Sequence, residues 1–333
     1  MDSSFKSRTI FSLIAAVFLA SPAGARDLDD YRRPMTIPFE GVAEYSPQSA
    51  TLGKMLFFDP RLSGAKNMNC ATCHNPSFGY ETPVPLAIGA ANTPLGRQAP
   101  TVLNMAFVSP NFWDGRAATL EEQAAGPITA PVEMNGHFDT IVTDLNAVPD
   151  YVSWFSEVFP DKGITRETIL TAIATYERTI VSGWSPFDRW VEGDEAAVSD
   201  SAKRGFDLFA GKARCSQCHS GWNFTDNEFH DIGLHSGDIG RAALEPDNPK
   251  ALYAFKTPGL RNTGYRAPYM HDGSLADLEA VIIHYENGFG DRPSLSPKLV
   301  PLRLTAEERA DLIAFMHTLT AEKQEASLPI LPN

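Results

Sequence analysis

One five-residue pattern, which occurs twice, constrains this chain more than any other feature. The pattern is Cys-x-x-Cys-His, at residues 70–74 and 215–219. It is the attachment signature of c-type haem, in which two thiols bind the porphyrin and the adjacent His ligates the iron. A single copy could also be half of a zinc site, but the two copies use all 4 Cys. The predicted haem-binding residues are Cys70, Cys73, His74, Cys215, Cys218 and His219.

The size and charge of the chain limit its class. Its 333 residues can form two medium-sized domains. The net charge of −13 disfavours nucleic acid and anionic membranes as partners.

The N-terminal residues 1–25 read as a secretory signal. Lys6 and Arg8 precede an apolar run from Ile10 to Ala20 that is too short to span a bilayer, and residues 23–25 form an A-x-A cleavage site. An uncleaved anchor is the alternative. Since no later run approaches transmembrane length, we expect a periplasmic protein with no stable membrane span after cleavage.

The chain reads as a duplication of one mostly helical unit. An amphipathic helix precedes each haem motif, beginning at Ser46 and Ser201, and a long loop and a closing helix follow it, at residues 165–183 and 305–320. A further helix starts at Thr119 and is expected to break at Gly126-Pro127. We predict a mostly α fold of two tandem cytochrome-c-like haem domains with long ordered loops, at residues 26–190 and 191–333.

The second axial ligand of each haem decides whether its iron is open. The chain has 8 His, and none lies between His74 and Trp113, in the loop best placed to cover the first haem. Met105 in that loop is a possible ligand, although a buried Met is more often core filling. We therefore expect the first iron to be five-coordinate and able to bind a small oxidant.

A helix over residues 275–286 carries the ligand candidates for the second haem. Its apolar face ends in Tyr285, and His284 lies about 100° round the helix. If this face meets the haem, Tyr285 reaches the iron and His284 does not. Periodicity alone leaves open that Tyr285 is a core residue.

Further motifs with fixed spacing lie between and after the haem sites. The first group is Phe112-Trp113-Asp114-Gly115-Arg116, Glu122-Gln123, Gly126-Pro127 and Pro131-Val132-Glu133-Met134. The second group is Lys256-Thr257-Pro258-Gly259-Leu260-Arg261-Asn262 and Pro268-Tyr269-Met270-His271-Asp272-Gly273-Ser274-Leu275. With the two haem motifs, and from about residue 46 to 320, the chain closely resembles the bacterial di-haem cytochrome c peroxidase/MauG superfamily.

The resemblance implies roles for individual residues. In the family, peroxide meets the N-terminal haem, and the acid/base residue twenty positions after the bridging Trp corresponds to Glu133. Gln123 and Pro127 correspond to residues that line the same pocket. Trp113 corresponds to the Trp that carries electrons between the haems. The His271-Asp272 pair is expected to be structural.

Two departures point to the MauG-like branch, which includes the MauG and MbnH types. Ordinary di-haem peroxidases carry a His ligand in the loop after the first motif, where this chain has Ala90. They also carry a Met fourteen residues after the His that corresponds to His271, and here that residue is Tyr285. MauG-like enzymes have Tyr there, so the resemblance and the helical face favour the same ligand, with His284 as the alternative.

A third position concerns the protein substrate. MauG, which completes the cofactor of methylamine dehydrogenase, has a surface Trp where this chain has Ala213. This difference counts against methylamine dehydrogenase and is compatible with the MbnH type, which oxidises a Trp of a copper-binding protein. Another exit for the oxidising equivalent is then needed, such as Trp222, Trp190 or Trp184.

The family also binds one Ca²⁺ between the haems, through an Asn side chain and two backbone carbonyls. The corresponding positions are Gln98, Arg266 and Pro268. Gln supplies the same amide oxygen on a longer side chain, so the resemblance implies a calcium site.

The function that follows is peroxide-driven oxidation of a periplasmic partner protein, at Trp side chains, by long-range electron transfer through a bis-Fe(IV) state. Glu133 moves the proton between the peroxide oxygens. One alternative is a conventional peroxidase that takes electrons from a small cytochrome or cupredoxin. The other is a non-catalytic di-haem electron carrier.

Overall fold

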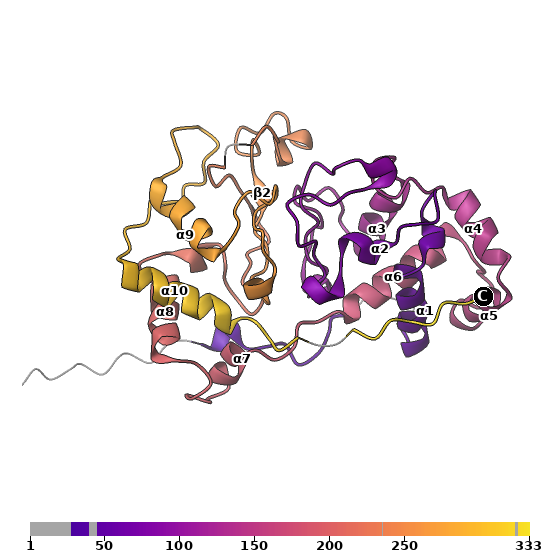
Figure 1. Cartoon of the computed structure of the whole chain (residues 1–333), viewed down its shortest axis with the longest axis horizontal. Coiled ribbons are helices and arrows are strands. Elements are labelled where there is room, and N and C mark those ends of the chain that lie inside the picture. The colour runs from indigo at the N-terminus through magenta and orange to yellow at the C-terminus, as the bar shows by residue number, and fades with distance from the viewer. Residues whose placement is uncertain (1–27, 40–44, 235, 324–325) are drawn as a thin grey trace, which may run out of the picture.

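The computed structural model describes residues 28–39, 45–234, 236–323 and 326–333, so the expected signal segment lies outside the described residues. The ribbon forms two lobes (Figure 1). The helices of the first lobe are α1 (Pro47–Phe57), α2 (Cys70–Cys73), α3 (Leu120–Thr129), α4 (Phe138–Asn146), α5 (Pro149–Val158) and α6 (Arg166–Thr179). Those of the second lobe are α7 (Pro186–Val191), α8 (Asp200–Ala210), α9 (Leu278–Asn287) and α10 (Ala306–Thr318).

Strands are minor, which confirms the mostly α prediction. Within the described residues, β1 (Phe229–His230) pairs with β2 (Phe255–Lys256) in one antiparallel two-stranded sheet. No helix in this part of the chain is both long and apolar enough to cross a membrane.

The helix starts follow from local chemistry. Ser46 and Thr165 accept hydrogen bonds from the backbone N–H groups at the third helical positions of α1 and α6, as N-caps do. Pro127, however, does not end α3, which continues to Thr129. The expected break is therefore wrong, because a Pro near the C-terminal end removes only one intrahelical bond and the remaining turn still closes through the Ala130 N–H and the Gly126 carbonyl.

In each lobe, the helix before the haem motif crosses the helix that closes the repeated unit, and a Gly lies at the contact. These pairs are α1 with α6 and α8 with α10. A Cβ on Gly53 of α1 would lie 1.8 Å from the Ala172 carbonyl oxygen of α6. A Cβ on Gly205 of α8 would lie 2.0 Å from the Asp311 carbonyl oxygen of α10. The two lobes therefore share the same close helix-helix contact, as the duplicated sequence predicts.

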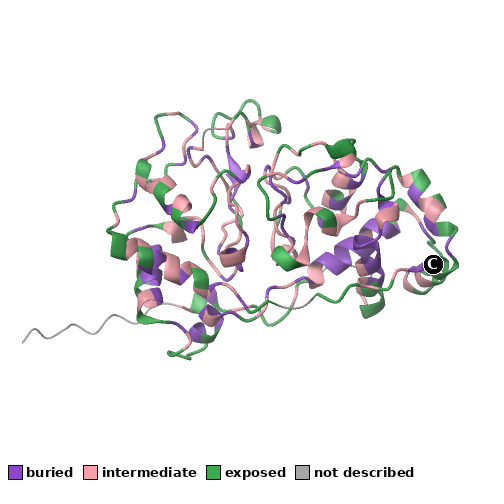
Figure 2. Cartoon of the chain, in the orientation of Figure 1, coloured by how far each residue is buried: buried purple, intermediate pink, exposed green. Residues whose placement is uncertain are grey.

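The buried residues follow this division (Figure 2). One cluster spans Leu52 to Ile180 and centres on α1 and α6. The other contains Phe187, Trp190 and the apolar faces of α8 and α10, together with Tyr31 from the N-terminal segment. The cavity at the second haem motif is lined by residues of both lobes, among them Gln98 and Trp113 of the first, so this site lies at their interface.

Candidate haem and electron-transfer site

The second haem motif lies in the wall of a cavity. Cys215, Cys218 and His219 line it together with Tyr285 and apolar residues of α9 and α10. The His219 Nδ1 lies 2.9 Å from the Phe224 carbonyl oxygen. Burial lowers the pKa of His219, so its ring is neutral and Nδ1 can donate to that carbonyl. The Nε2 atom is then left with a lone pair for iron, as in other metal-binding His residues.

Tyr285 and His284 have different surroundings, although they are adjacent. Tyr285 lines the cavity of the second motif, whereas His284 Nε2 lies 2.9 Å from the Ile232 carbonyl oxygen. Burial, with smaller effects of the neighbouring thiols, raises the pKa of the Tyr285 phenol. Coordination to a metal cation would oppose that effect. The geometry therefore brings Tyr285, and not His284, together with the second motif.

The first haem motif has the same local design. Its two Cys are the first and last residues of α2, and His74 Nδ1 lies 3.2 Å from the Tyr80 carbonyl oxygen. Burial also lowers the pKa of His74, so its Nε2 is available in the same way. Both motifs thus present thiols beside a neutral His with one nitrogen held by a carbonyl, which fits covalently attached haem.

Glu133 lies close to the first motif. Burial raises the pKa of Cys73 to about 11, with a further contribution from the nearby Glu133 carboxylate. Burial also raises the pKa of Glu133, and the guanidinium of Arg116 opposes this effect. A carboxyl with a raised pKa can both hold and release a proton, as acid/base chemistry requires.

The C-terminal end of α3 positions Glu133. The Met134 N–H donates to the Pro127 carbonyl at 3.1 Å, and the Glu133 N–H donates to the Ala130 carbonyl at 3.0 Å. Gln123 lies on the same helix, one turn before Pro127. The three residues predicted to share a pocket therefore belong to one folded segment, α3 and the turn that follows it.

Trp113 lies in a loop of the first lobe that contacts the second lobe. It lines the cavity of the second motif and also a smaller cavity, to which residues of the loop after the first motif (100–108) and residues 256–261 of the second lobe contribute. Its indole Nε1 donates to the Gln98 carbonyl at 2.9 Å, and its own carbonyl accepts from the Lys256 N–H at 2.8 Å. Both ends of this residue are therefore held at the interface between the lobes.

Two of the predicted calcium positions meet. The buried Gln98 side chain donates from Nε2 to the Pro268 carbonyl at 2.6 Å. The Arg266 side chain is paired with the buried carboxylate of Glu81, which leaves the Arg266 backbone carbonyl as its only possible contribution to a cation site. Rotating the Gln98 amide by about 180° would put Oε1 next to the Pro268 carbonyl, so these neutral oxygens are compatible with a calcium ion.

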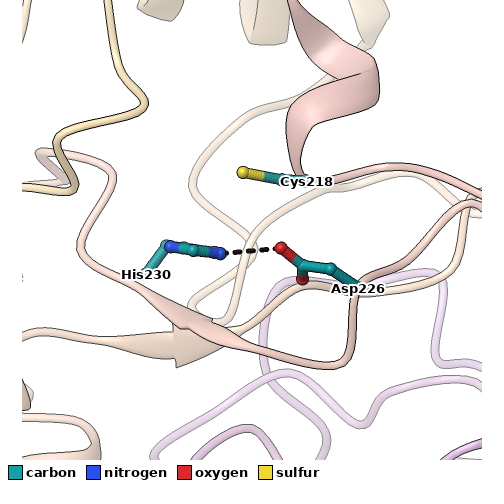
Figure 3. Close-up of side chains that lie close together, drawn as sticks. All are labelled: Cys218, Asp226 and His230. Atoms are coloured by element: carbon teal, nitrogen blue, oxygen red, sulfur yellow. Dashed lines mark hydrogen bonds and ion pairs between the residues drawn. The ribbon is translucent and has the colours of Figure 1, made fainter.

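A group of possible metal ligands near the second motif has a different explanation. Ligand atoms of Cys218, Asp226 and His230 lie within 4.8 Å of one another (Figure 3). The Cys218 sulfur belongs to the haem-attachment motif, so it is not available as a thiolate. Burial lowers the pKa of His230, whereas its hydrogen bond to Asp226 raises it. With Lys298 Nζ 2.9 Å from the same carboxylate, the group is an ion-pair network.

The other predicted residues are placed as follows. Met105 packs against the core of the first lobe, as expected for core filling. Ala213, at the position of the surface Trp in MauG, is buried. Of the Trp residues considered as exits, Trp190 and Trp222 are 2% and 9% exposed and Trp184 is 55% exposed.

Sequence reasoning missed two buried titratable groups. Glu177 of α6 is buried near Cys70, and Lys256 of β2 is buried between the two cavities. Lys256 lies within a motif quoted above, and this was the only available signal. Glu177 lies on a helix face that is otherwise apolar, which gave no functional signal.

Comparison with known proteins agrees with this architecture. Residues 47–196 match the model of the di-haem cytochrome c peroxidase family, and residues 202–320 match that of cytochrome c. The chain belongs to the di-haem cytochrome c peroxidase family, and it is a di-haem, peroxidase-like oxidoreductase with two haem c groups.

Within this family the chain is similar to MauG. It is 50% identical to the methylamine utilization protein MauG of Methylorubrum extorquens over 91% of this chain and 86% of the relative. It is 43% identical to the MauG of Methylophilus methylotrophus over 98% and 99% of the two chains. The crystal structure of a MauG-like protein associated with microbial copper homeostasis superposes with a TM-score of 0.79, at 31% identity, over 87% of this chain and 93% of that chain. These similarities support a MauG-type di-haem oxidoreductase.

Proposed function

We propose that this enzyme uses hydrogen peroxide to oxidise Trp side chains of a partner protein, without the partner entering the haem pocket. The observation that carries the proposal is the difference between the two sites. Tyr285 lines the cavity of the second motif, whereas the loop after the first motif contains no His. The first haem, with an unoccupied axial position, would react with peroxide. The second haem, with both axial positions occupied, would store an oxidising equivalent.

The haem groups, when bound, supply the reaction with peroxide and the storage of two oxidising equivalents. His74 and His219 would hold the irons through Nε2, and Tyr285 would be the second protein ligand at the second site. Glu133 takes the proton from the inner peroxide oxygen and returns it to the outer one, so that water can leave. Gln123 lines the same pocket and orients the peroxide.

Trp113 is the proposed relay between the sites. Its indole lines both cavities, and its N–H is held by the Gln98 carbonyl, which limits its motion. A fixed aromatic ring between two redox centres shortens each electron-transfer step. The same Gln98 would bind Ca²⁺ through its side chain, with the carbonyls of Arg266 and Pro268, so the ion would stabilise the relay.

The relatives and the sequence support a location and a class of partner. The leader expected at residues 1–25 and the covalent haem favour the periplasm. The two MauG relatives are methylamine utilization proteins, which favours a partner from that process, although Ala213 counts against methylamine dehydrogenase itself. Since Ala213 is buried, the oxidising equivalent would leave by a route other than that of MauG, and Trp184 is the most exposed Trp among the exits considered.

Resting ferric EPR of the holoprotein tests the division between the sites. We expect one high-spin and one low-spin signal. Two low-spin signals would contradict the proposal and support an electron carrier. The substrate distinguishes the proposed function from that of a conventional peroxidase. Rapid peroxide turnover with a small cytochrome or cupredoxin, and no oxidised Trp in any partner, would favour the conventional peroxidase.

The protein substrate is tested by mass spectrometry. The enzyme is treated with peroxide and with candidate partners from methylamine utilization, and oxidised Trp is sought in the partner.

In a Glu133→Gln variant, peroxide should react with the open haem about 10²–10⁴-fold more slowly, because the amide cannot accept the proton. An exposed control, Glu157→Gln, should react at the wild-type rate. An unchanged rate in Glu133→Gln would remove this residue from the mechanism.

A further inference from the structure

Lys256 is a buried ammonium group with an unusual set of neighbours. Its side chain is at the end of β2, and the residue is 9% exposed. The Nζ atom donates to the Pro110 carbonyl at 2.7 Å, which satisfies one hydrogen bond but neutralises no charge. Burial lowers the pKa of Lys256 to about 8, with no opposing effect from any carboxylate. Within the described residues, this cation therefore lacks a counter-ion.

Apart from Arg214, which is exposed and donates to the Gln217 side chain, the other Lys and Arg residues in the walls of the same cavities do have one. Arg266 is paired with Glu81, and Lys298 with Asp226. The buried Arg261, which lines the smaller cavity, lies 2.8 Å from a carboxylate oxygen of Asp188. Burying an uncompensated charge costs several kcal/mol in order of magnitude, so such a group is expected to meet an anion that does not belong to the chain.

The position of Lys256 indicates which anion this is. Lys256 and Trp113 both line the cavity of the second haem motif and the smaller cavity beside residues 100–108. The Lys256 backbone N–H donates to the Trp113 carbonyl, so the backbone of Lys256 is held next to that of the proposed relay. A c-type haem is attached through its vinyl edge and carries two propionate carboxylates on the opposite edge.

We propose that the Lys256 ammonium is the counter-ion of a haem propionate at the interface between the lobes, beside Trp113. The inference rests on the two haem groups and not on the identity of the protein substrate. The ion pair fixes the propionate edge of one haem next to the relay. The positive charge also favours the reduced form of that haem and so raises its reduction potential.

Reduction potentials of the holoprotein test this assignment. Lys256→Gln keeps a donor for the Pro110 carbonyl but removes the charge, and Lys256→Arg keeps the charge. Spectroelectrochemical titration should show a more negative potential for one haem in Lys256→Gln, with Lys256→Arg close to the wild type. A shift of the low-spin haem assigns the propionate to the second site, and a shift of the high-spin haem assigns it to the first site. Lys212→Met, at a half-exposed lysine on the surface, should leave both potentials unchanged.

A structural role alone predicts a different result. If Lys256→Gln binds both haems and keeps both potentials, the charge has no role and the proposal is overturned. If this variant does not acquire haem, the propionate bending band in resonance Raman spectra of the wild type and Lys256→Arg decides the question. A shift of this band supports the contact, because the donor has changed, and an unchanged band contradicts it.

Discussion

Tyr285 and His284, adjacent residues of α9, are the two candidates for the second axial ligand of the second haem. Only Tyr285 lines the cavity of the second motif, because His284 turns to the Ile232 carbonyl. We expect Tyr285→Phe to lose the low-spin ferric EPR signal of the second haem, since the phenyl ring has no ligand atom. His284→Gln is the matched control and should keep the signal. The reverse result would assign the ligand to His284.

Glu177 is a buried carboxyl that the proposed reaction does not use. Burial raises its pKa to about 8, with Arg178 opposing and Glu121 adding to the effect. The folded protein therefore retains this proton at pH values where the unfolded chain, with a pKa near 4.5, releases it. Stability is then lost as the pH rises from about 4.5 to about 8, by about 1.4 kcal/mol for each unit of the shift.

Glu177→Gln should remove this pH dependence. Differential scanning calorimetry should show a small difference in Tm between the variant and the wild type near pH 5, and a growing advantage of the variant towards pH 8. The exposed Glu157→Gln serves as the control, with the wild-type profile. A variant that follows the wild type at every pH would mean that Glu177 is ionised in the folded protein.

The residues that sequence predicted and those that it missed differ in a physical way. The Cys and His of each haem motif could be predicted because fixed spacing on one short element brings them to one group. Tyr285 could be predicted because the apolar face of its helix and the family resemblance favour the same residue. Glu177 and Lys256 could not, because their behaviour depends on burial by segments distant in the sequence. The counter-ion proposed for Lys256 is not part of the amino-acid sequence at all.

At the scale of elements, the crossing of opening and closing helices is the unit that the chain repeats. A methyl group at Gly53 or Gly205 would overlap a backbone carbonyl of the facing helix. We expect Gly53→Ala and Gly205→Ala each to destabilise the domain concerned by about 1–3 kcal/mol or more, since backbone cannot move aside as a flexible side chain can. Chemical denaturation measures this loss.

Gly96 provides the control for this prediction. A Cβ on Gly96 would meet no atom within 4 Å, so Gly96→Ala should have nearly wild-type stability. Equal stability of Gly53→Ala and Gly96→Ala would mean that the helices can separate without cost. The paired glycines could be recognised in the sequence as part of a repeat. Their contact could not, because it depends on the crossing of two helices more than a hundred residues apart in each lobe.

At the scale of the molecule, contacts between the lobes place the two haem sites relative to each other. Arg97, in the loop after the first motif, binds Asp238 of the second lobe through two nitrogens, at 2.6 and 2.9 Å. The Lys256–Trp113 backbone hydrogen bond lies at the same interface. The duplicated sequence predicted two domains but not this arrangement, since such contacts join loops that carry no periodic pattern.

The C-terminal segment 326–333 is a further connection, because it follows the last helix of the second lobe and lies along the first (Figure 1). Lys54 Nζ donates to Ser327 Oγ at 2.9 Å, and Arg61 donates to the Pro332 carbonyl at 3.0 Å. Leu331 packs against the hydrophobic core of the first lobe. The segment thus contributes apolar contact and hydrogen bonds to a domain from which it is distant in sequence.

Removing residues 327–333 should therefore destabilise the first domain by about 1–3 kcal/mol, the sum expected for one partly buried Leu and two hydrogen bonds. Calorimetry should show a lower Tm for the first domain and an unchanged Tm for the second. Leu331→Ala should reproduce part of the loss, and Leu328→Ala, at a residue that is 72% exposed, should reproduce none. An equal loss in both domains would instead mean that the lobes unfold as one cooperative unit, with the segment as a structural part of both.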